Sequence, residues 1–189
     1  MKKIIFILVV IPFFGYSQKE YTVDRITGFK SILLGNNLSN YEKNLKFIRD
    51  YGEYSVYNYD NEISQELLYF FGKKVKAIRL TFDNSTSRLT TIFLDFSENY
   101  NVNHLTILPS ELEKLYKDIS AEIGPASSPK SINSASFYPL SIKGEILWIG
   151  NNIVLKVITG SEAKLNFDGT SYLMKNESIS FISKDTWNN

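Results

Sequence analysis

The sequence predicts an α+β protein made of two similar helix-plus-antiparallel-sheet units packed as one compact body. Three observations predict this fold. The motif S-x-x-E occurs twice, about 70 residues apart, and such a capping box satisfies free backbone amides at the start of a helix. Helical periodicity follows each motif and ends at a glycine. Alternating apolar residues then follow, as expected for strands with one buried face.

Each predicted helix begins at its capping box. The first box is Ser39-Asn40-Tyr41-Glu42, and the apolar residues at helical spacing after it are Tyr41, Leu45 and Ile48. The second box is Ser110-Glu111-Leu112-Glu113, and its apolar residues are Leu112, Leu115, Tyr116, Ile119 and Ile123. Gly52 and Gly124 can adopt the left-handed conformation past a helix end, and Pro125 reinforces the second stop. The two boxes therefore indicate an internal duplication.

Strands are expected after each helix. In the first half they span 54–59, 67–71, 75–82 and 89–96, with turns at 72–73 and 83–88. In the second half they span 145–149, 153–159, 165–167 and 177–183. Gly150-Asn151-Asn152 and Asp168-Gly169 are the expected hairpin turns, because Gly and Asn tolerate the positive φ angles that such turns require.

The first 17 residues have the pattern of a secretory signal peptide. Lys2 and Lys3 precede an apolar run over 4–14, and Gly15 and Ser17 supply small residues for cleavage after Ser17. As a helix this run would reach only about 17 Å, against about 30 Å of bilayer hydrocarbon. The sequence therefore predicts export to the periplasm or beyond the cell, with no transmembrane anchor after cleavage.

The mature chain divides into three predicted parts. Residues 18–123 hold the first helix-sheet unit and the second helix, and 137–189 hold the second sheet. Between them, 124–136 is rich in Gly, Pro and Ser, which predicts a loop. We expect these parts to form one compact domain, and the sequence leaves the oligomeric state open.

Charge and composition narrow the classes of partner. The chain has 21 Lys and Arg against 20 Asp and Glu, and loss of Lys2 and Lys3 leaves it nearly neutral. A near-neutral surface gives no electrostatic reason to bind nucleic acid. The chain has no cysteine, so it has no disulfide, and the common zinc and thiol sites are absent. His104 is the single histidine and cannot build a multi-histidine metal site, so no cofactor is expected.

One motif offers an alternative metal site. Asp83, Ser85 and Ser87 spell D-x-S-x-S after an expected strand, which resembles the metal-ion-dependent adhesion site of von Willebrand factor A domains. In those domains the Asp and Ser oxygens hold Mg²⁺. The residues that follow here read as a strand, not the helix of that fold. A polar hairpin turn explains the same residues, since Asp, Asn and Ser favour turns.

Aromatic residues supply the candidate binding residues. Tyr54, Tyr57 and Tyr59 crowd one expected strand, and Trp148 lies on a later hairpin. Exposed rings on a strand could stack on sugars or contact a peptide. The alternative is that these rings line the core.

Short motifs carry a family resemblance. Ile32-Leu33-Leu34-Gly35 before the first capping box, and Ile123-Gly124-Pro125 after the second helix, resemble motifs of small exported bacterial proteins. The duplicated layout resembles the β-lactamase-inhibitor-protein fold and the single-unit SmpA/OmlA envelope lipoproteins. The lipid-bearing cysteine of the latter is absent. The resemblance implies a fold and transfers no functional residue.

Together these observations predict an exported, non-catalytic binding or interaction module of the bacterial envelope, with a protein or polymer partner. No catalytic constellation is recognisable, and edge strands of an antiparallel sheet can pair with a partner strand. The alternative is an envelope hydrolase that uses carboxylates brought together from distant segments.

Overall fold

The computed structural model describes residues 22–101, 109–129, 141–165 and 171–188. This part of the chain is mostly β, with one antiparallel sheet of nine strands and two small two-stranded sheets. Within it, α1 (Pro109–Ile123) is the single helix longer than two turns. The predicted α+β fold of two similar helix-plus-sheet units is therefore wrong, and the predicted duplication is not supported.

The strands are β1 (Gly28–Phe29), β2 (Ile32–Leu33), β3 (Leu45–Asp50), β4 (Tyr54–Tyr59), β5 (Tyr69–Phe70), β6 (Lys73–Lys74), β7 (Ala77–Asp83), β8 (Leu89–Asp95), β9 (Glu98–Asn101), β10 (Ser128–Pro129), β11 (Ser141–Ile149), β12 (Ile153–Leu165) and β13 (Ser171–Ser183). A second, short helix is α2 (Lys184–Asn188), and 3-10 turns occur at Thr22–Arg25, Leu38–Asn40, Glu42–Asn44 and Gln65–Leu68.

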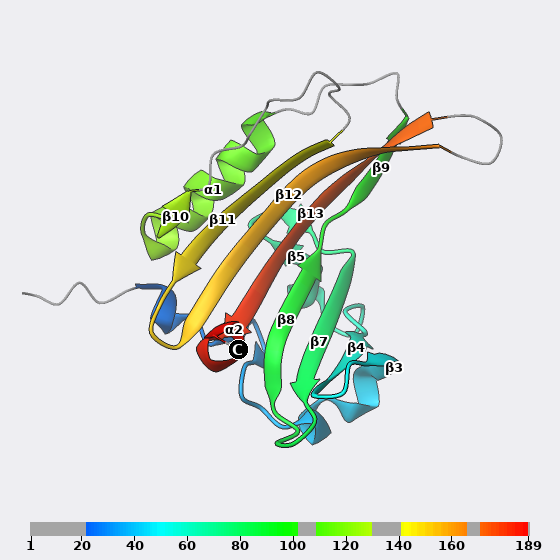
Figure 1. The fold of residues 1–189 in the computed structure, drawn as a ribbon, viewed down its shortest axis with the longest axis vertical. Helices are drawn as coiled ribbons and strands as arrows, with labels where there is room; N and C mark the ends of the chain where they lie inside the picture. Colours follow the sequence, from blue (N-terminus) through cyan, green and yellow to red (C-terminus); the bar gives the residue numbers. More distant parts are fainter. Residues whose placement is uncertain (1–21, 102–108, 130–140, 166–170, 189) are drawn as a thin grey trace, which may run out of the picture.

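The main sheet joins early and late parts of the chain. Its strands lie in the order β10-β11-β12-β13-β8-β7-β4-β3, and β9 also pairs with β13. β8 and β9 keep one register along β13, since Asp95 pairs with Ser178 and Glu98 with Lys175. They act as one strand with a two-residue interruption. Figure 1 shows β11, β12 and β13 running the length of the sheet, whereas β8, β7, β4 and β3 form its shorter part.

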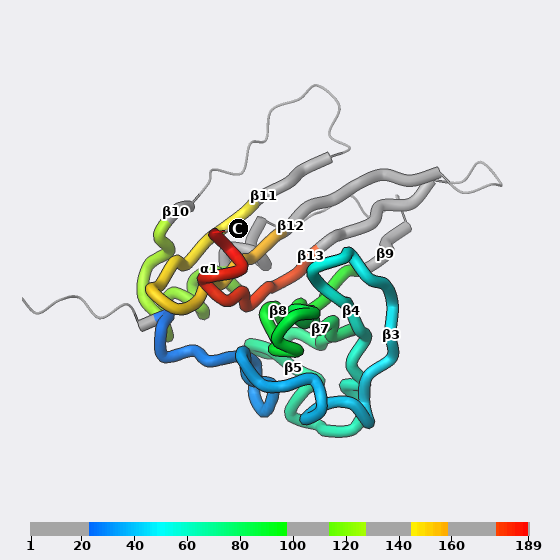
Figure 2. Tube along the Cα trace, turned by 60° about the horizontal axis from the view of Figure 1, so that its bottom comes forward, coloured from blue at the N-terminus to red at the C-terminus, as the bar shows by residue number. Residues whose placement is uncertain are grey.

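The hydrophobic core lies on one face of this sheet. Directly paired positions place apolar side chains in a continuous row across six strands, formed by Trp148, Leu155, Phe181, Ile92, Leu80 and Tyr57. Residues 23–41, residues 67–75 and α1 cover this face. The first two segments meet where the rings of Phe29 and Phe70 lie 5.9 Å apart, and Figure 2 shows them side by side.

The opposite face is more polar and is partly covered by α2. Lys156 Nζ lies 2.9 Å from Glu145 Oε2 and 5.5 Å from the centre of the Trp187 ring. On the same face Arg79 lies 3.3 Å from Asp95 Oδ2. An antiparallel sheet with one apolar face and one polar face has this pattern.

The first predicted helix does not form. Asn37, not Ser39, caps the local turn, because Asn37 Oδ1 accepts hydrogen bonds from Ser39 N and Ser39 Oγ at 3.1 and 3.0 Å. Two 3-10 turns follow, and the chain then extends as β3 and pairs with β4. Gly52 is left-handed (φ +83°), but in the β3–β4 turn, where its N–H donates to Asp50 Oδ1 at 2.6 Å. Pairing with a neighbouring strand outweighs the local capping signal.

Several other predicted elements are confirmed. The second helix spans Pro109–Ile123, so it begins one residue before the predicted capping box, and it ends before a left-handed Gly124 (φ +88°) as predicted. The strands predicted over 54–59 and 89–96 correspond to β4 and β8. β11 and β12 form the predicted hairpin, and the N–H of Gly150 donates to Ile153 O at 2.9 Å.

Other predicted strands differ in extent. The strand predicted over 67–71 is a 3-10 turn followed by the short β5, and β7 begins two residues later than predicted. β11, β12 and β13 are longer than predicted.

Some predictions fall outside the described residues. These are the signal peptide over 1–17, His104, the turn at Asp168-Gly169 and most of the loop over 124–136. In the part of the chain that the structure describes, neither helix combines the length and apolar character that a membrane crossing requires.

Candidate functional site

A cavity of about 350 Å³ lies between the covering segments and the core face of the sheet. Its floor consists of the buried side chains Phe29, Ile119, Ile123, Leu155 and Phe181. Its mouth is lined by Ile26, Lys30, Phe70, Phe71 and Glu122, which are half-buried or exposed. The space therefore runs from an apolar floor to a rim that carries two charged side chains.

The segment that carries Ile26, Phe29 and Lys30 forms one wall. Lys30 occupies the turn between β1 and β2 with φ +54°, an uncommon conformation for a residue with a side chain. This segment is held at its start, because the carboxylate of Asp24 accepts hydrogen bonds from the N–H groups of Asn151 and Asn152, both at 2.8 Å. The wall is thus fixed to the β11–β12 turn.

That attachment requires glycine at position 150. A Cβ there would lie 2.8 Å from Val23 Cγ1 and would also collide with the carboxylate of Asp24. The Gly150-Asn151-Asn152 turn therefore makes the hairpin and also receives Asp24, the residue that anchors the first wall of the cavity.

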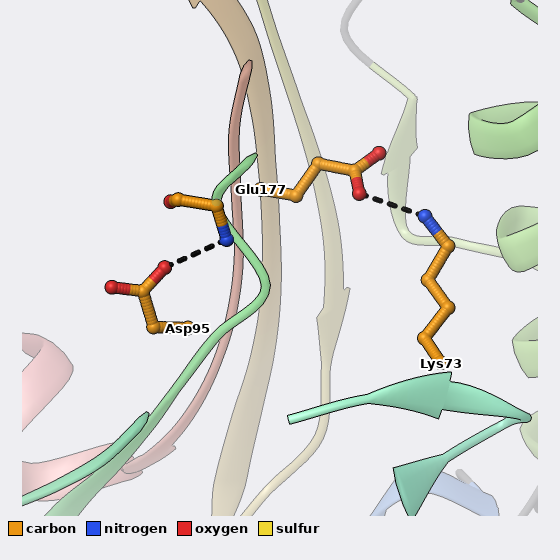
Figure 3. A network of polar contacts seen from close by, with 4 residues as sticks. Lys73, Asp95 and Glu177 are labelled. Carbon is orange, nitrogen blue, oxygen red and sulfur yellow. Dashed lines mark hydrogen bonds and ion pairs between the residues drawn. The ribbon is translucent and has the colours of Figure 1, made fainter. Parts of the chain in front are cut away.

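The β5–β6 hairpin forms the second wall. Phe71 and Gly72 make its turn with φ +47° and +76°, and the ring of Phe70 lies 6.0 Å from that of Phe181 on the floor. Lys73 Nζ lies 2.7 Å from Glu177 Oε2, and this ion pair attaches the hairpin to β13. Figure 3 shows the two side chains reaching toward each other across the space between hairpin and sheet.

Helix α1 forms the third wall. Ile119 and Ile123 point into the core, and Glu122 lies at the mouth of the cavity. The end of the helix is fixed by Trp148, whose Nε1–H donates to Gly124 O at 2.9 Å and whose ring lies 5.9 Å from that of Tyr116. Glu122 therefore projects from a rigid element.

The mouth carries one positive and one negative side chain. Lys30 and Glu122 are both exposed, and neither forms an ion pair with any residue that the structure describes. Groups that remain unpaired at the rim of an apolar cavity are available to a ligand. The cavity thus offers apolar surface in depth and charges of both signs at its opening.

The predicted aromatic binding residues lie elsewhere. Trp148 is 1% exposed and belongs to the core. Tyr59 is buried against Tyr41, and this burial raises the pKa of the Tyr59 hydroxyl above its usual value of 10.0. Tyr57 is half-buried between the rings of Phe47 and Phe82, and Tyr54 lies half-buried on the opposite face of β4.

The three residues of the alternative metal site form a turn. Asp83 Oδ1 accepts hydrogen bonds from Ser85 Oγ at 2.6 Å and Thr86 N at 2.7 Å, and these hold the pKa of the Asp83 carboxyl below its usual value of 3.8. Ser87 is left-handed (φ +55°), and its N–H donates to Asp83 O at 2.8 Å. Within the described ranges no three His, Cys, Asp or Glu side chains cluster as a metal site would require.

An exposed apolar strand is a second candidate surface that the sequence analysis missed. β3 is the last strand in the order of the main sheet, and the sequence analysis predicted a helix for this segment. Phe47, Ile48 and the adjacent Tyr51 are 56%, 39% and 55% exposed. The pairing with β4 shifts between Phe47 and Arg49, which marks a bulge. One feature of the sequence could have indicated this strand. The β-prone pair Phe47-Ile48 lies in a segment that has only three apolar residues at helical spacing.

Comparison with known proteins adds no relative. No protein-family model matches this chain, and neither a curated protein nor a solved structure is detectably similar to it. The resemblance to exported bacterial proteins stays a prediction.

Proposed function

We propose that this protein is an exported, non-catalytic binding module that takes up a small apolar molecule in the cavity between α1, the β1–β2 turn and the β5–β6 hairpin. One observation carries the proposal, namely about 350 Å³ of space directly above buried apolar side chains. Small-molecule pockets are mostly apolar and measure about 300–1,000 Å³.

The charges near the cavity support binding over hydrolysis. Catalysis by carboxylates requires two acidic groups that face one substrate. Among the described residues that line the cavity, Glu122 is the single carboxylate, and its counterpart at the mouth is Lys30. Asp95 and Glu177 lie close together in the sheet, but their carboxylates point to opposite sides (Figure 3).

Calorimetric titration of the mature chain with 1-octanol, an uncharged single-chain molecule, tests the proposal. We expect saturable binding with a negative heat-capacity change, because apolar surface is removed from water. Ile26→Trp fills the mouth and should weaken binding at least tenfold. Ile63→Trp is the matched control, since Ile63 is exposed away from the cavity. Absence of saturable binding, or equal binding by both variants, would contradict the proposal.

Export is the second part of the proposal and rests on the predicted signal peptide. The test is the intact mass of the protein purified from its native source. A chain that begins at Gln18 supports export, and a chain that begins at Met1 contradicts it.

The exposed edge of β3 favours a second candidate function, which is recognition of an extended polypeptide by strand addition. The exposed Phe47 and Ile48 would then contact side chains of the added strand. Charged residues such as Lys46 and Arg49, together with the bulge, are devices that also protect edge strands from pairing. The cavity is therefore the primary site of the proposal.

A further inference from the structure

We infer that the ligand of the cavity is an amphiphile with a single apolar chain or ring and a zwitterionic head, and this inference rests on the proposed function. The apolar body would lie against Phe181 and Leu155, and the head would remain at the mouth. Its negative group would face Lys30, and its positive group would face Glu122.

The size of the cavity limits the apolar body. The share of liquid volume of one water molecule is about 30 Å³, so about 350 Å³ admits roughly a dozen non-hydrogen atoms. This is the size of one medium alkyl chain or one aromatic group. A body with two long chains would not fit inside.

The floor offers such a body nothing but apolar contacts. It consists of aromatic and aliphatic side chains, among them the adjacent rings of Phe29 and Phe181, whose centres are 6.3 Å apart. A polar group placed there would lose its hydrogen bonds to water without replacement. The polar part of the ligand must therefore lie at the rim.

The charges at the rim select the head. Lys30 and Glu122 project from different elements, a turn and a helix, and each is without an ionic partner in the described part of the chain. A head with a net charge would be attracted by one of them and repelled by the other. A zwitterionic head satisfies both, because each of its charges meets the opposite sign.

Titrations at low salt with four probes test the inference. Three probes share a twelve-carbon chain and are used below their micelle concentrations: dodecylphosphocholine, dodecanoate and dodecyltrimethylammonium. We expect dodecylphosphocholine to bind about fivefold tighter than the other two, a modest factor because the charges are exposed. Free phenylalanine, the fourth probe, distinguishes an amino acid from a lipid-like source. Tighter binding of phenylalanine than of dodecylphosphocholine would assign the site to amino acids with the same head chemistry.

Charge variants give the sharpest test. Lys30→Glu places two negative charges at the mouth and should shift the preference to dodecyltrimethylammonium, whereas Glu122→Lys should shift it to dodecanoate. The double variant restores one charge of each sign and should restore the preference for a zwitterion. Lys43→Glu is the control, because Lys43 is exposed outside the cavity.

The outcomes separate the two proposals. Suppose that 1-octanol binds, but the three twelve-carbon probes bind with equal affinity to wild type and to the charge variants. The head assignment is then wrong, and the cavity remains a binding site. If 1-octanol does not bind saturably to the folded protein, the proposed function itself is wrong.

Discussion

Lys73 and Glu177 are 104 residues apart in sequence, yet their side chains meet at 2.7 Å between Nζ and Oε2. The carboxylate of Glu177 is largely buried on the core face of β13, and Lys73 belongs to the β5–β6 hairpin that walls the cavity. The pair therefore fixes the hairpin to the sheet, and the shape of the cavity depends on it.

Replacing Glu177 by Gln should destabilise the protein by about 2 kcal/mol. Removing one partner of a fully buried pair costs about 3–5 kcal/mol, and the Lys73 side chain keeps 24% exposure, which lowers the expected cost. Glu145→Gln removes a more exposed pair with Lys156 and should cost less than about 1 kcal/mol. Urea denaturation measures both values. Equal stability of wild type and Glu177→Gln would show that the ion pair does not hold the hairpin.

Asp24→Ala should lower the free energy of unfolding by about 1–2 kcal/mol, because the N–H groups of Asn151 and Asn152 lose a charged acceptor. The variant should also raise amide exchange around Phe29, since Asp24 anchors the first wall of the cavity. Hydrogen exchange read by mass spectrometry measures this change. Glu53→Ala, at an exposed carboxylate, serves as the control. Unchanged exchange in the β1–β2 segment would speak against this anchoring.

The turn at Asp83 predicts a stability difference that depends on pH. The folded-state pKa of Asp83 is lowered, mainly by the hydrogen bond from Ser85, so the carboxylate contributes stability that is fully present above its unfolded-state pKa. This contribution is lost as the pH falls through the folded-state pKa. The melting temperature of Asp83→Asn should lie below that of wild type at pH 7, and the gap should narrow as the pH falls below 3.8, the usual pKa of the carboxyl. A gap that stays constant over this range would exclude the mechanism.

Phe47→Lys tests the second candidate surface. Because Phe47 is exposed, the variant should keep its fold. Its free energy of unfolding should fall by less than about 1 kcal/mol, mainly because the ring contact with Tyr57 is lost. If β3 accepts an added strand, extended apolar peptides selected from a random library on wild type should lose at least tenfold in affinity for the variant. Selected peptides that bind both proteins equally would remove the edge of β3 as a recognition site.

A capping box predicted a helix correctly where the residues after it also have helical periodicity. The box at Ser110-Glu111-Leu112-Glu113 precedes four further apolar residues at helical spacing, and α1 forms there. The box at Ser39-Asn40-Tyr41-Glu42 precedes a weaker pattern, and the adjacent β4 offers a complete edge for pairing. Long-range pairing of this kind is invisible in a single sequence, so the first helix was predicted where a strand exists.

The cavity could not be predicted for the same reason. Its floor and mouth come from α1, β12, β13, the β1–β2 segment and the β5–β6 hairpin, and no motif links them. Aromatic residues on strands were the predicted binding residues, but Tyr59 and Trp148 are packed inside the core. A large aromatic residue serves a core and a binding face equally well, so composition alone could not separate the two.

Entry of a small apolar molecule into this cavity can be followed by methyl-resolved NMR during titration with 1-octanol. We expect saturable chemical-shift changes of the methyl groups of Ile119, Ile123 and Leu155, with those of Ile48 and Ile63 unchanged. Shifts that do not saturate, or that are as large at Ile63 as at Ile119, would contradict it.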